Sequence, residues 1–297
     1  MSITLKRESQ ATIIDVCPLC KSAESNVYAQ YKEFTWVSCS CGLIYKRSEL
    51  ANYGSDEIYD PSYFKAGDEK HSHAYDRRTR RRIQKSKIQI RHALKYTTIG
   101  PLLDIGCSLG YTLKAAKDMG LSGYGIDIAQ YAVDRCREQG LVAEIGGLDS
   151  IPHADKTFNI VLMKHVLEHT PQPSRALKEA YRALKPGGSI FIAVPHAGYI
   201  KARLNPVRSR FFRPDCRGGS EHYVYYTPRT LSQLLELNGF RVKRTHPHLL
   251  YSGKSFIGLS AELLVVPFRY LGGLLRTALG LRKEFWIIAV RPRQEAP

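Results

Sequence analysis

Acidic residues are scarce in this sequence of 297 residues. It contains 27 Asp and Glu against 44 Lys and Arg, which gives a formal net charge of +17. Such an excess of positive charge predicts attraction to an acidic partner: nucleic acid, an anionic membrane or a phosphorylated substrate. The apolar fraction of 43% is ordinary, so the chain can bury a sizeable core.

Long uninterrupted apolar runs are also missing. The N-terminal stretch MSITLKRESQATIID has no apolar core of a signal peptide, so we expect a cytoplasmic protein. Residues 249–283 are the most apolar segment, but Glu262, Pro267 and several arginines interrupt the run of about 20 residues that spans a bilayer. Two hypotheses remain for this insertion: a helix packed on the protein, or peripheral contact with the inner face of the membrane.

Four of the seven cysteines form two close pairs near the N-terminus. Cys17 and Cys20 are followed about 20 residues later by Cys39 and Cys41. In a reducing compartment such spacing indicates a zinc site more than disulfides. We therefore predict a four-cysteine, zinc-ribbon-like module over residues 1–50, with structural zinc. The remaining cysteines are isolated in sequence and predicted to pack in the core: Cys107, Cys136 and Cys216.

Residues 51–99 form a predicted linker and basic helix. In YDRRTRRRIQKSKIQIRHALK, residues 75–95, the apolar positions Ile83, Ile90 and Leu94 recur at helical spacing among arginines and lysines. The charged face either is simply solvated or contacts an acidic partner.

From residue 100 to residue 297, short apolar runs alternate with helical stretches. The runs are PLLDIG, SGYGIDI, LVAEIG, FNIVLMKH and SIFIAVP, with two more near residues 240–246 and 284–290. Strands separated by helices predict an α/β domain with a parallel sheet.

The first strand ends in a glycine-containing turn, LLDIGCSLG, at residues 102–110. Gly106 and Gly110 would let the backbone approach a ligand at the start of a helix. The second strand ends in Asp127, where a carboxylate can accept both hydroxyls of a ribose. Together they predict an adenosine-type cofactor. The turn departs from the G-x-G-x-x-G pattern of NAD-binding domains, and nothing later resembles a dehydrogenase.

With GYGIDI, FNIVLMKHVLEHTPQP, ALKPGG and HYVYYTPRTLSQLLELNGF, this turn resembles class I S-adenosylmethionine-dependent methyltransferases, most closely the branch of ubiquinone-biosynthesis O-methyltransferases. The resemblance implies a Rossmann-like, seven-stranded sheet with helices on both faces and an antiparallel last strand. It also implies a cofactor site made of Asp104, Gly106, Cys107, Gly110, Asp127, Ile128, Gly147, Leu148 and Lys164. Family members often carry Asp or Ser where this chain has Gly147, so the adenine contact would come from the backbone at Gly147 and Leu148, or from Asp149.

The pentapeptide HVLEH, residues 165–169, matches the H-x-x-E-H signature of inverted zinc peptidases. Such a site needs one uninterrupted helix, and here Pro171 and Pro173 follow at once. We predict instead a single turn at the carboxyl end of the fourth strand, where α/β sheets bind ligands.

The turn also resembles the E-x-x-E-H stretch of small-RNA 2′-O-methyltransferases, which binds a divalent metal together with a later histidine. The predicted catalytic residues are His165, Glu168, His169 and His222, with His196 as the alternative later histidine. Four roles remain open: a structural tie, a metal-free base at His165 or His222, a catalytic divalent metal, and positioning alone.

Residues 196–228 form a predicted lid over the acceptor. They mix aromatic residues with five arginines that suit phosphate or carboxylate recognition: Arg203, Arg208, Arg210, Arg213 and Arg217. A basic loop without a ligand is the plainer alternative. We predict methylation of a small or lipid-linked metabolite at a hydroxyl oxygen. The alternative is an RNA methyltransferase that uses the zinc module and the basic surface.

Overall fold

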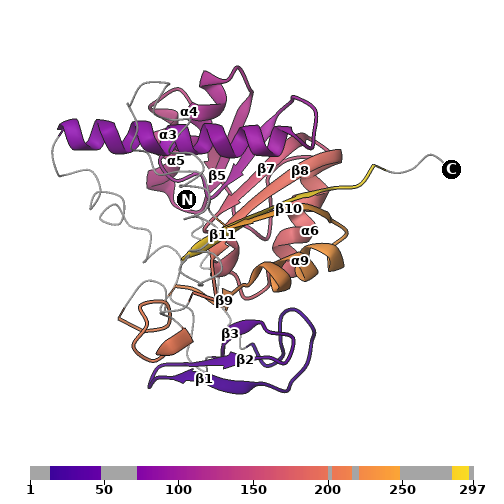
Figure 1. The fold of residues 1–297 in the computed structure, drawn as a ribbon. Helices are drawn as coiled ribbons and strands as arrows, with labels where there is room; N and C mark the ends of the chain where they lie inside the picture. Colours follow the sequence, from indigo (N-terminus) through magenta and orange to yellow (C-terminus); the bar gives the residue numbers. More distant parts are fainter. Residues whose placement is uncertain (1–13, 48–71, 200–202, 216–220, 248–282, 294–297) are drawn as a thin grey trace, which may run out of the picture.

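A seven-stranded sheet forms the centre of the computed structural model, which describes residues 14–47, 72–199, 203–215, 221–247 and 283–293 (Figure 1). The strands are β4 (Leu102–Ile105), β5 (Gly123–Asp127), β6 (Val142–Ile145), β7 (Phe158–Lys164), β8 (Leu184–Pro195), β10 (Arg241–Pro247) and β11 (Glu284–Val290). Their order is β10-β11-β8-β7-β4-β5-β6, and β11 runs antiparallel to both of its neighbours. The predicted strands and the Rossmann-like fold class are therefore confirmed.

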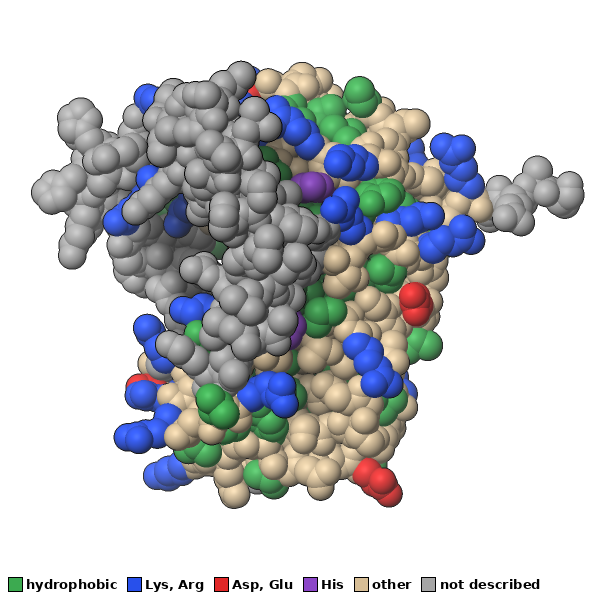
Figure 2. Space-filling view, in the orientation of Figure 1, with side chains coloured by type: hydrophobic (Ala, Val, Ile, Leu, Met, Phe, Trp, Pro, Cys, Tyr) green, Lys and Arg blue, Asp and Glu red, His purple; other side chains and the backbone are tan. Residues whose placement is uncertain are grey.

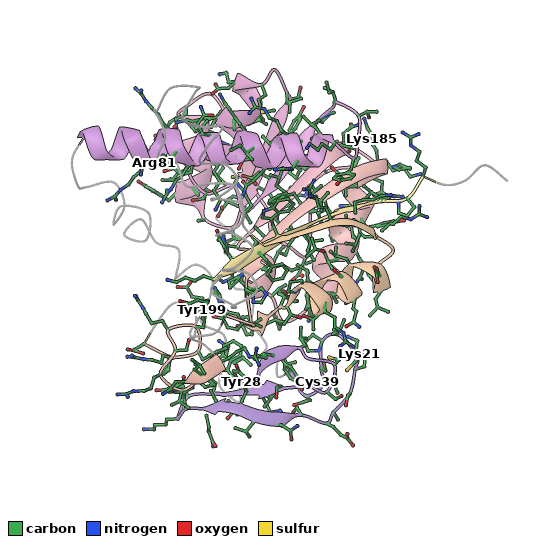
Figure 3. The ribbon with its side chains drawn as sticks, viewed as in Figure 1. Lys21, Tyr28, Cys39, Arg81, Lys185 and Tyr199 are labelled. Atoms are coloured by element: carbon green, nitrogen blue, oxygen red, sulfur yellow. The ribbon has the colours of Figure 1, made fainter. Side chains whose placement is uncertain are left out.

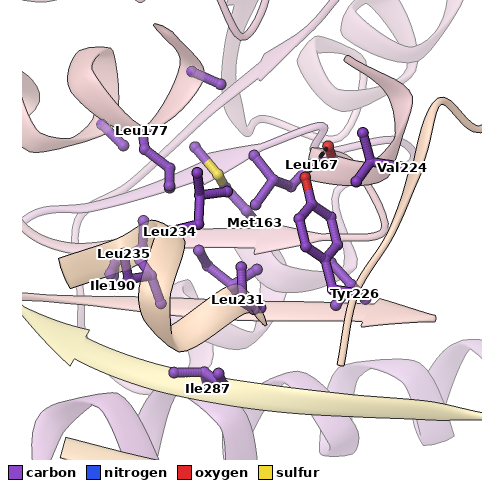
Figure 4. Close-up of a cluster of buried hydrophobic side chains, with 14 of the residues drawn as sticks. Met163, Leu167, Leu177, Ile190, Val224, Tyr226, Leu231, Leu234, Leu235 and Ile287 are labelled. Atoms are coloured by element: carbon purple, nitrogen blue, oxygen red, sulfur yellow. Dashed lines mark hydrogen bonds between the residues drawn. The ribbon is translucent and has the colours of Figure 1, made fainter. Parts of the chain in front are cut away.

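Helices cover both faces of this sheet (Figure 1). One face carries α3 (Ser72–Leu94), α4 (Tyr111–Asp118) and α5 (Gln130–Arg137); the other carries α6 (Pro173–Ala183) and α9 (Pro228–Leu237). Because both faces of the sheet are covered, every residue of β4 and nearly every residue of β7 is buried, and both strands are mainly apolar. Figure 4 shows the core under α6 and α9, where Leu231 and Met163 lie close to Leu167 and Tyr226.

The predicted basic helix is α3, and its apolar stripe packs on the sheet. Ile90 is fully buried against the core, while Ile83 and Leu94 are partly buried there. Arg78, Arg81 and Arg91 are exposed on the outer side. The amphipathic pattern is thus explained by packing of one face, and the cations are left to solvent or to a partner.

The N-terminal module is a second, antiparallel sheet that shares a strand with the main domain. Its own strands are β1 (Asn26–Gln30), β2 (Thr35–Ser38) and β3 (Ile44–Arg47). The fourth strand, β9 (Val224–Tyr225), comes from the other end of the chain and pairs antiparallel with β3. The sequence predicted a separate module and did not reveal this strand.

Residues 203–215 of the predicted lid rest on that module. The indole N–H of Trp36 donates to the carbonyl of Phe212 (3.1 Å), and the hydroxyl of Tyr31 donates to that of Val207 (2.8 Å). The rings of Trp36 and Phe212 also meet edge-on at 5.3 Å. Tyr28 and Tyr199 belong to the same region between module and main domain (Figure 3). Hydrogen bonds and aromatic packing therefore join this segment to the module.

Some predictions fall outside the described residues: Cys216, Arg217, the linker at 48–71, and residues 249–282 of the apolar insertion. Within the described ranges, no helix has both the length and the apolar character needed to cross a bilayer.

Candidate functional site

The glycine-containing turn lies between β4 and α4, next to the end of β5. Gly106 and Gly110 have φ angles of 71° and 75°, the left-handed region that favours glycine. Asp127 holds the turn closed: its two carboxylate oxygens accept hydrogen bonds from the backbone N–H groups of Ser108 (2.8 Å) and Ala129 (3.0 Å). Residues 106–110 and Asp127 are therefore one rigid unit at the carboxyl edge of the sheet.

Close packing also leaves no room for a side chain at these two glycines. A Cβ atom on Gly106 would lie 2.5 Å from Cγ2 of Val166, and one on Gly110 would lie 2.6 Å from Cδ1 of Leu141. Either contact is too short to tolerate. The glycines thus set the shape of the turn, whose free side is left for a ligand.

Asp104 is a buried carboxylate directly before the turn. It is 1% exposed, and the Lys164 ammonium lies 3.5 Å from Oδ1, while Lys164 also contacts the Thr112 hydroxyl. Burial raises the pKa of Asp104, and the charge of Lys164 opposes that rise. Neither oxygen has a well-formed hydrogen bond within the described chain. The Asp104 carboxylate therefore suits the ammonium group of an amino-acid ligand, and the Lys164 ammonium suits its carboxylate.

Apolar surface for a base is present beyond Asp127. Ile128 is 40% exposed, and Gly147 lies close to it: a Cβ on Gly147 would meet Cγ2 of Ile128 at 3.5 Å. Leu148 is partly buried beside the core, whereas Asp149 is exposed. The predicted cofactor residues are gathered at one edge of the sheet, and their donor set fits S-adenosylmethionine.

Cys107 and Cys136 are buried as predicted, but they are not isolated from each other. They share a small hydrophobic cluster under the turn, and the Cys136 thiol lies 3.2 Å from the carbonyl of Ser108. Cys107 therefore supports the turn from below.

Replacing Asp127 with Ala is expected to weaken S-adenosylmethionine binding by about 1–3 kcal/mol, because the ribose loses a charged acceptor and the turn loses two hydrogen bonds. Calorimetry on the folded variant measures this change. Asp134→Ala is a matched control, since Asp134 lies on α5 and the described hydrogen bond of its side chain is to Gln130. Unchanged affinity in Asp127→Ala would remove Asp127 from the site.

The HVLEH segment is a short turn at the end of β7, as predicted. His165 has a φ of 55°, Leu167–His169 form one 3-10 turn, η1, and α6 begins only at Pro173. The two histidines therefore do not lie on one helix as a peptidase site requires.

His165 lies between two carboxylates. Its Nδ1 is 3.4 Å from Oε1 of Glu168, and its Nε2 is 2.9 Å from Oε2 of Glu284. Burial lowers the pKa of His165, but the neighbouring carboxylates of Glu168 and Glu284 outweigh it and raise the pKa to about 9. Contact of the half-exposed ring with water weakens this effect without reversing it. His165 therefore carries a proton at neutral pH, which argues against it as the general base.

Glu168, His169 and His222 form a tight cluster beside His165. One ligand atom from each lies within 4.8 Å of the others. Glu168 is fully buried, and neither carboxylate oxygen has a well-formed hydrogen bond within the described residues. Burial raises the pKa of Glu168, but His165 and the other histidines outweigh it, so the pKa lies below its ordinary value. A buried anion thus faces two imidazoles.

The hydrogen bonds around His222 determine which of its nitrogens is free. Its Nδ1 lies 2.8 Å from the hydroxyl of Tyr225, and that hydroxyl donates to the carbonyl of Phe211 at 2.5 Å. Because the tyrosine proton is already used, Nδ1 of His222 must be the donor, and Nε2 keeps its lone pair. Burial lowers the pKa of His222 to about 3, so the ring is neutral.

His169 is held in a comparable way. A hydrogen bond joins its ring to the backbone carbonyl of Glu221, while burial lowers its pKa. Hydrogen bonds that fix the tautomer and leave one ring nitrogen free are typical of metal-binding histidines, and they serve a general base equally well. His196 lies elsewhere, with its ring against Phe285. The later histidine of the cluster is therefore His222.

Sequence reasoning missed Glu284, because a glutamate at the start of a distant strand carries no local signal. It also missed Tyr225, whose hydroxyl fixes the tautomer of His222.

The four cysteines of the module meet as predicted. Their sulfurs lie within 4.8 Å of one another, with 3.4 Å between Cys20 and Cys39 and 3.6 Å between Cys17 and Cys41. Tetrahedral zinc with bonds of about 2.3 Å separates its sulfurs by about 3.8 Å, so the four thiols fit the ion.

Comparison with known proteins adds to this geometry. A family model described as a methyltransferase domain matches residues 72–245, more than half of the chain. A ubiquinone biosynthesis O-methyltransferase of Methylococcus capsulatus is 31% identical over 139 residues, which cover 44% of this chain and 59% of the relative. One from Coxiella burnetii is 22% identical over 148 residues, or 48% and 63% of the two chains. The chain thus spans roughly 60% of the length of these relatives.

Solved structures show the same fold at low identity. A chain of the complex between the Trm112 methyltransferase activator of Haloferax volcanii and a methyltransferase superposes with a TM-score of 0.53 at 19% identity, covering 77% of this chain and 98% of that one. A SAM-dependent methyltransferase of Thermotoga maritima gives 0.51 at 19% identity, covering 72% and 91%.

Proposed function

This chain belongs to the methyltransferase-domain family, and from that premise we propose that it transfers a methyl group from S-adenosylmethionine to a hydroxyl oxygen of a small or lipid-linked metabolite. The observation that carries the proposal is the cluster of Glu168, His169 and His222 at the carboxyl edge of the sheet, where the cofactor turn also lies. The likeness to ubiquinone-biosynthesis O-methyltransferases supports oxygen as the accepting atom.

His222, Glu168 and His165 each have a defined part in this proposal. The acceptor hydroxyl must lose its proton as the methyl group arrives. The Nε2 lone pair of His222 can receive that proton, and the buried Glu168 carboxylate stabilises the imidazolium that results. The protonated His165 lies between Glu168 and Glu284 and fixes the carboxylate of Glu168.

The same three side chains would also hold a divalent metal, because one ligand atom from each lies within 4.8 Å of the others. Such an ion, when bound, would polarise the accepting hydroxyl. The two versions share their residues and differ in whether turnover depends on an added metal.

A lipid-linked acceptor is supported by the position of the apolar insertion. The described residues on either side of it are the end of β10 and the start of β11, and Glu284 on β11 reaches His165. The described residues that flank the apolar segment therefore lie at the edge that carries the cluster. If it contacts membrane, the protein should co-sediment with anionic vesicles at low salt; equal indifference to anionic and neutral vesicles would remove this support.

RNA methylation is the second candidate, favoured by the exposed cations Arg78, Arg81, Arg91 and Lys95 along and just after α3. Lys and Arg side chains are spread over the face in Figure 2, with few acidic side chains between them.

One experiment tests the proposal against this candidate. The protein is incubated with methyl-labelled S-adenosylmethionine and three separate pools: aqueous metabolites, extracted lipids and total RNA. We expect label in the metabolite or lipid pool, identified by mass spectrometry, and none with Glu168→Gln. Label confined to RNA would favour the second candidate. Cofactor binding without transfer to any pool would contradict both.

A further inference from the structure

Lys46 is a buried lysine on β3 of the four-cysteine module. The residue is 5% exposed, and its ammonium lies 4.8 Å from the ring centres of Phe34 and Tyr223 and 5.8 Å from that of Trp36. Burial lowers its pKa to about 7, and the charge of Glu221 opposes that fall. Burying an ammonium is costly, and an apolar side chain would suit these rings without that cost. A contribution to stability therefore does not explain why a lysine is buried here.

Lys46 interacts with the residues on both sides of His222. The backbone N–H of Lys46 donates to the carbonyl of Tyr223 at 2.8 Å, and its ammonium lies over the Tyr223 ring. On the other side of His222, the charge of Glu221 acts on the ammonium. Lys46 thus contacts residues 221–223 at Tyr223 and acts on Glu221 through its charge.

These residues are bound in turn to the HVLEH turn. The backbone N–H of Tyr223 donates to the carbonyl of Glu168 at 2.8 Å, and the carbonyl of Glu221 is hydrogen-bonded to the ring of His169. The His222 ring meets that of His169 edge-on at 4.6 Å. A shift of residues 221–223 would therefore move His222 relative to Glu168 and His169 together.

We propose that Lys46 is a positioning residue of the acceptor site, by which the four-cysteine module holds His222 against Glu168 and His169. The module is then a working part of the site. Cation–π contacts and the charge of Glu221 keep the ammonium in place. The expected effect of Lys46 on turnover rests on the proposed function. Its effect on the placement of His222 does not.

The test replaces Lys46 with Met, which keeps the length of the side chain and removes the charge. We expect kcat to fall by about 10- to 100-fold, since a displacement near 1 Å at a reacting group has that effect. Affinity for S-adenosylmethionine, zinc content and melting temperature should stay at wild-type level, or the melting temperature should rise. Lys46→Arg, which restores a cation, should recover part of the loss.

Lys21→Met is the matched control. Lys21 lies in the same module, and its ammonium donates to the carbonyl of Pro18 at 3.2 Å, within the cysteine-bearing turn. We expect wild-type turnover from this variant. If Lys46→Met also turns over at the wild-type rate, or only its melting temperature changes, the inference is overturned. Should Lys46→Met not fold, Lys46→Gln takes its place with the same expected outcomes.

A second measurement separates this inference from the proposed function. Imidazole ¹⁵N NMR of the wild-type protein should show His222 as the neutral tautomer with its proton on Nδ1. In Lys46→Met we expect that signal to shift or to broaden into mixed tautomers, and in Lys21→Met to stay unchanged. If no acceptor is ever methylated, the proposed function fails while this comparison still stands. An unaltered His222 signal in Lys46→Met would refute the positioning role itself.

Discussion

Glu168→Gln is expected to lower kcat by about 10²- to 10⁴-fold, the range ascribed to general acid–base groups, with little change in affinity for S-adenosylmethionine. The substitution keeps the shape of the side chain and removes the one buried negative charge that His165, His169 and His222 share. Either version of the chemistry needs that charge, because it stabilises a protonated His222 and would bind a divalent metal. Single-turnover kinetics with labelled cofactor measures the chemical step directly.

Glu179→Gln is the matched control for this prediction. Glu179 lies on α6 and pairs with Arg182 at 3.0 Å, away from the cluster, so turnover should be retained. Normal turnover by Glu168→Gln would show that the cluster is structural. Dialysed wild-type protein that regains activity only with added Mg²⁺ or Mn²⁺ would identify a metal site, and activity indifferent to both ions would favour the metal-free version of the reaction.

Cys39→Ser is expected to abolish tight zinc binding and to destabilise the module strongly. Zinc binding contributes about 10–16 kcal/mol in zinc-finger peptides, and removing one of four thiolates forfeits much of it. Cys39 is buried in the main core cluster with Leu43 and Leu231, so the loss should also reach α9 and lower the melting temperature of the whole chain. Figure 3 shows Cys39 in the N-terminal module, on the same side of it as Lys21.

Elemental analysis and thermal unfolding measure the two effects. Wild-type protein should hold one zinc per chain, and Ser40→Ala, a change at the exposed neighbouring residue, should leave both zinc and melting temperature unchanged. Freshly purified wild-type protein without zinc would defeat the prediction. Because β3 follows Cys39 and Cys41 directly and pairs with β9, acceptor turnover should fall along with zinc content.

The sequence by itself determined the main sheet, because the signals there are local. Each buried strand is a short apolar run between helical stretches, and alternation of the two leaves a parallel sheet as the simplest arrangement. Other signals are equally local in the sequence: the turn at Gly106 and Gly110, the carboxylate of Asp127 and the prolines after His169. These signals predicted that the cofactor site and the HVLEH turn lie at the carboxyl edge of the sheet. The spacing of the four cysteines predicted a zinc site.

Only the tertiary structure decided what surrounds His222. β9 is two residues long, too short for any periodicity, and its pairing with β3 depends on how two distant parts of the chain meet. The same holds for Glu284 beside His165 and for Lys46 beside Tyr223. Whether a histidine is a base or a protonated anchor depends on its neighbours in space, since burial alone leaves His222 neutral while two carboxylates keep a proton on His165. Sequence spacing identified the candidate catalytic histidines, and their three-dimensional surroundings determine which of them carries a proton.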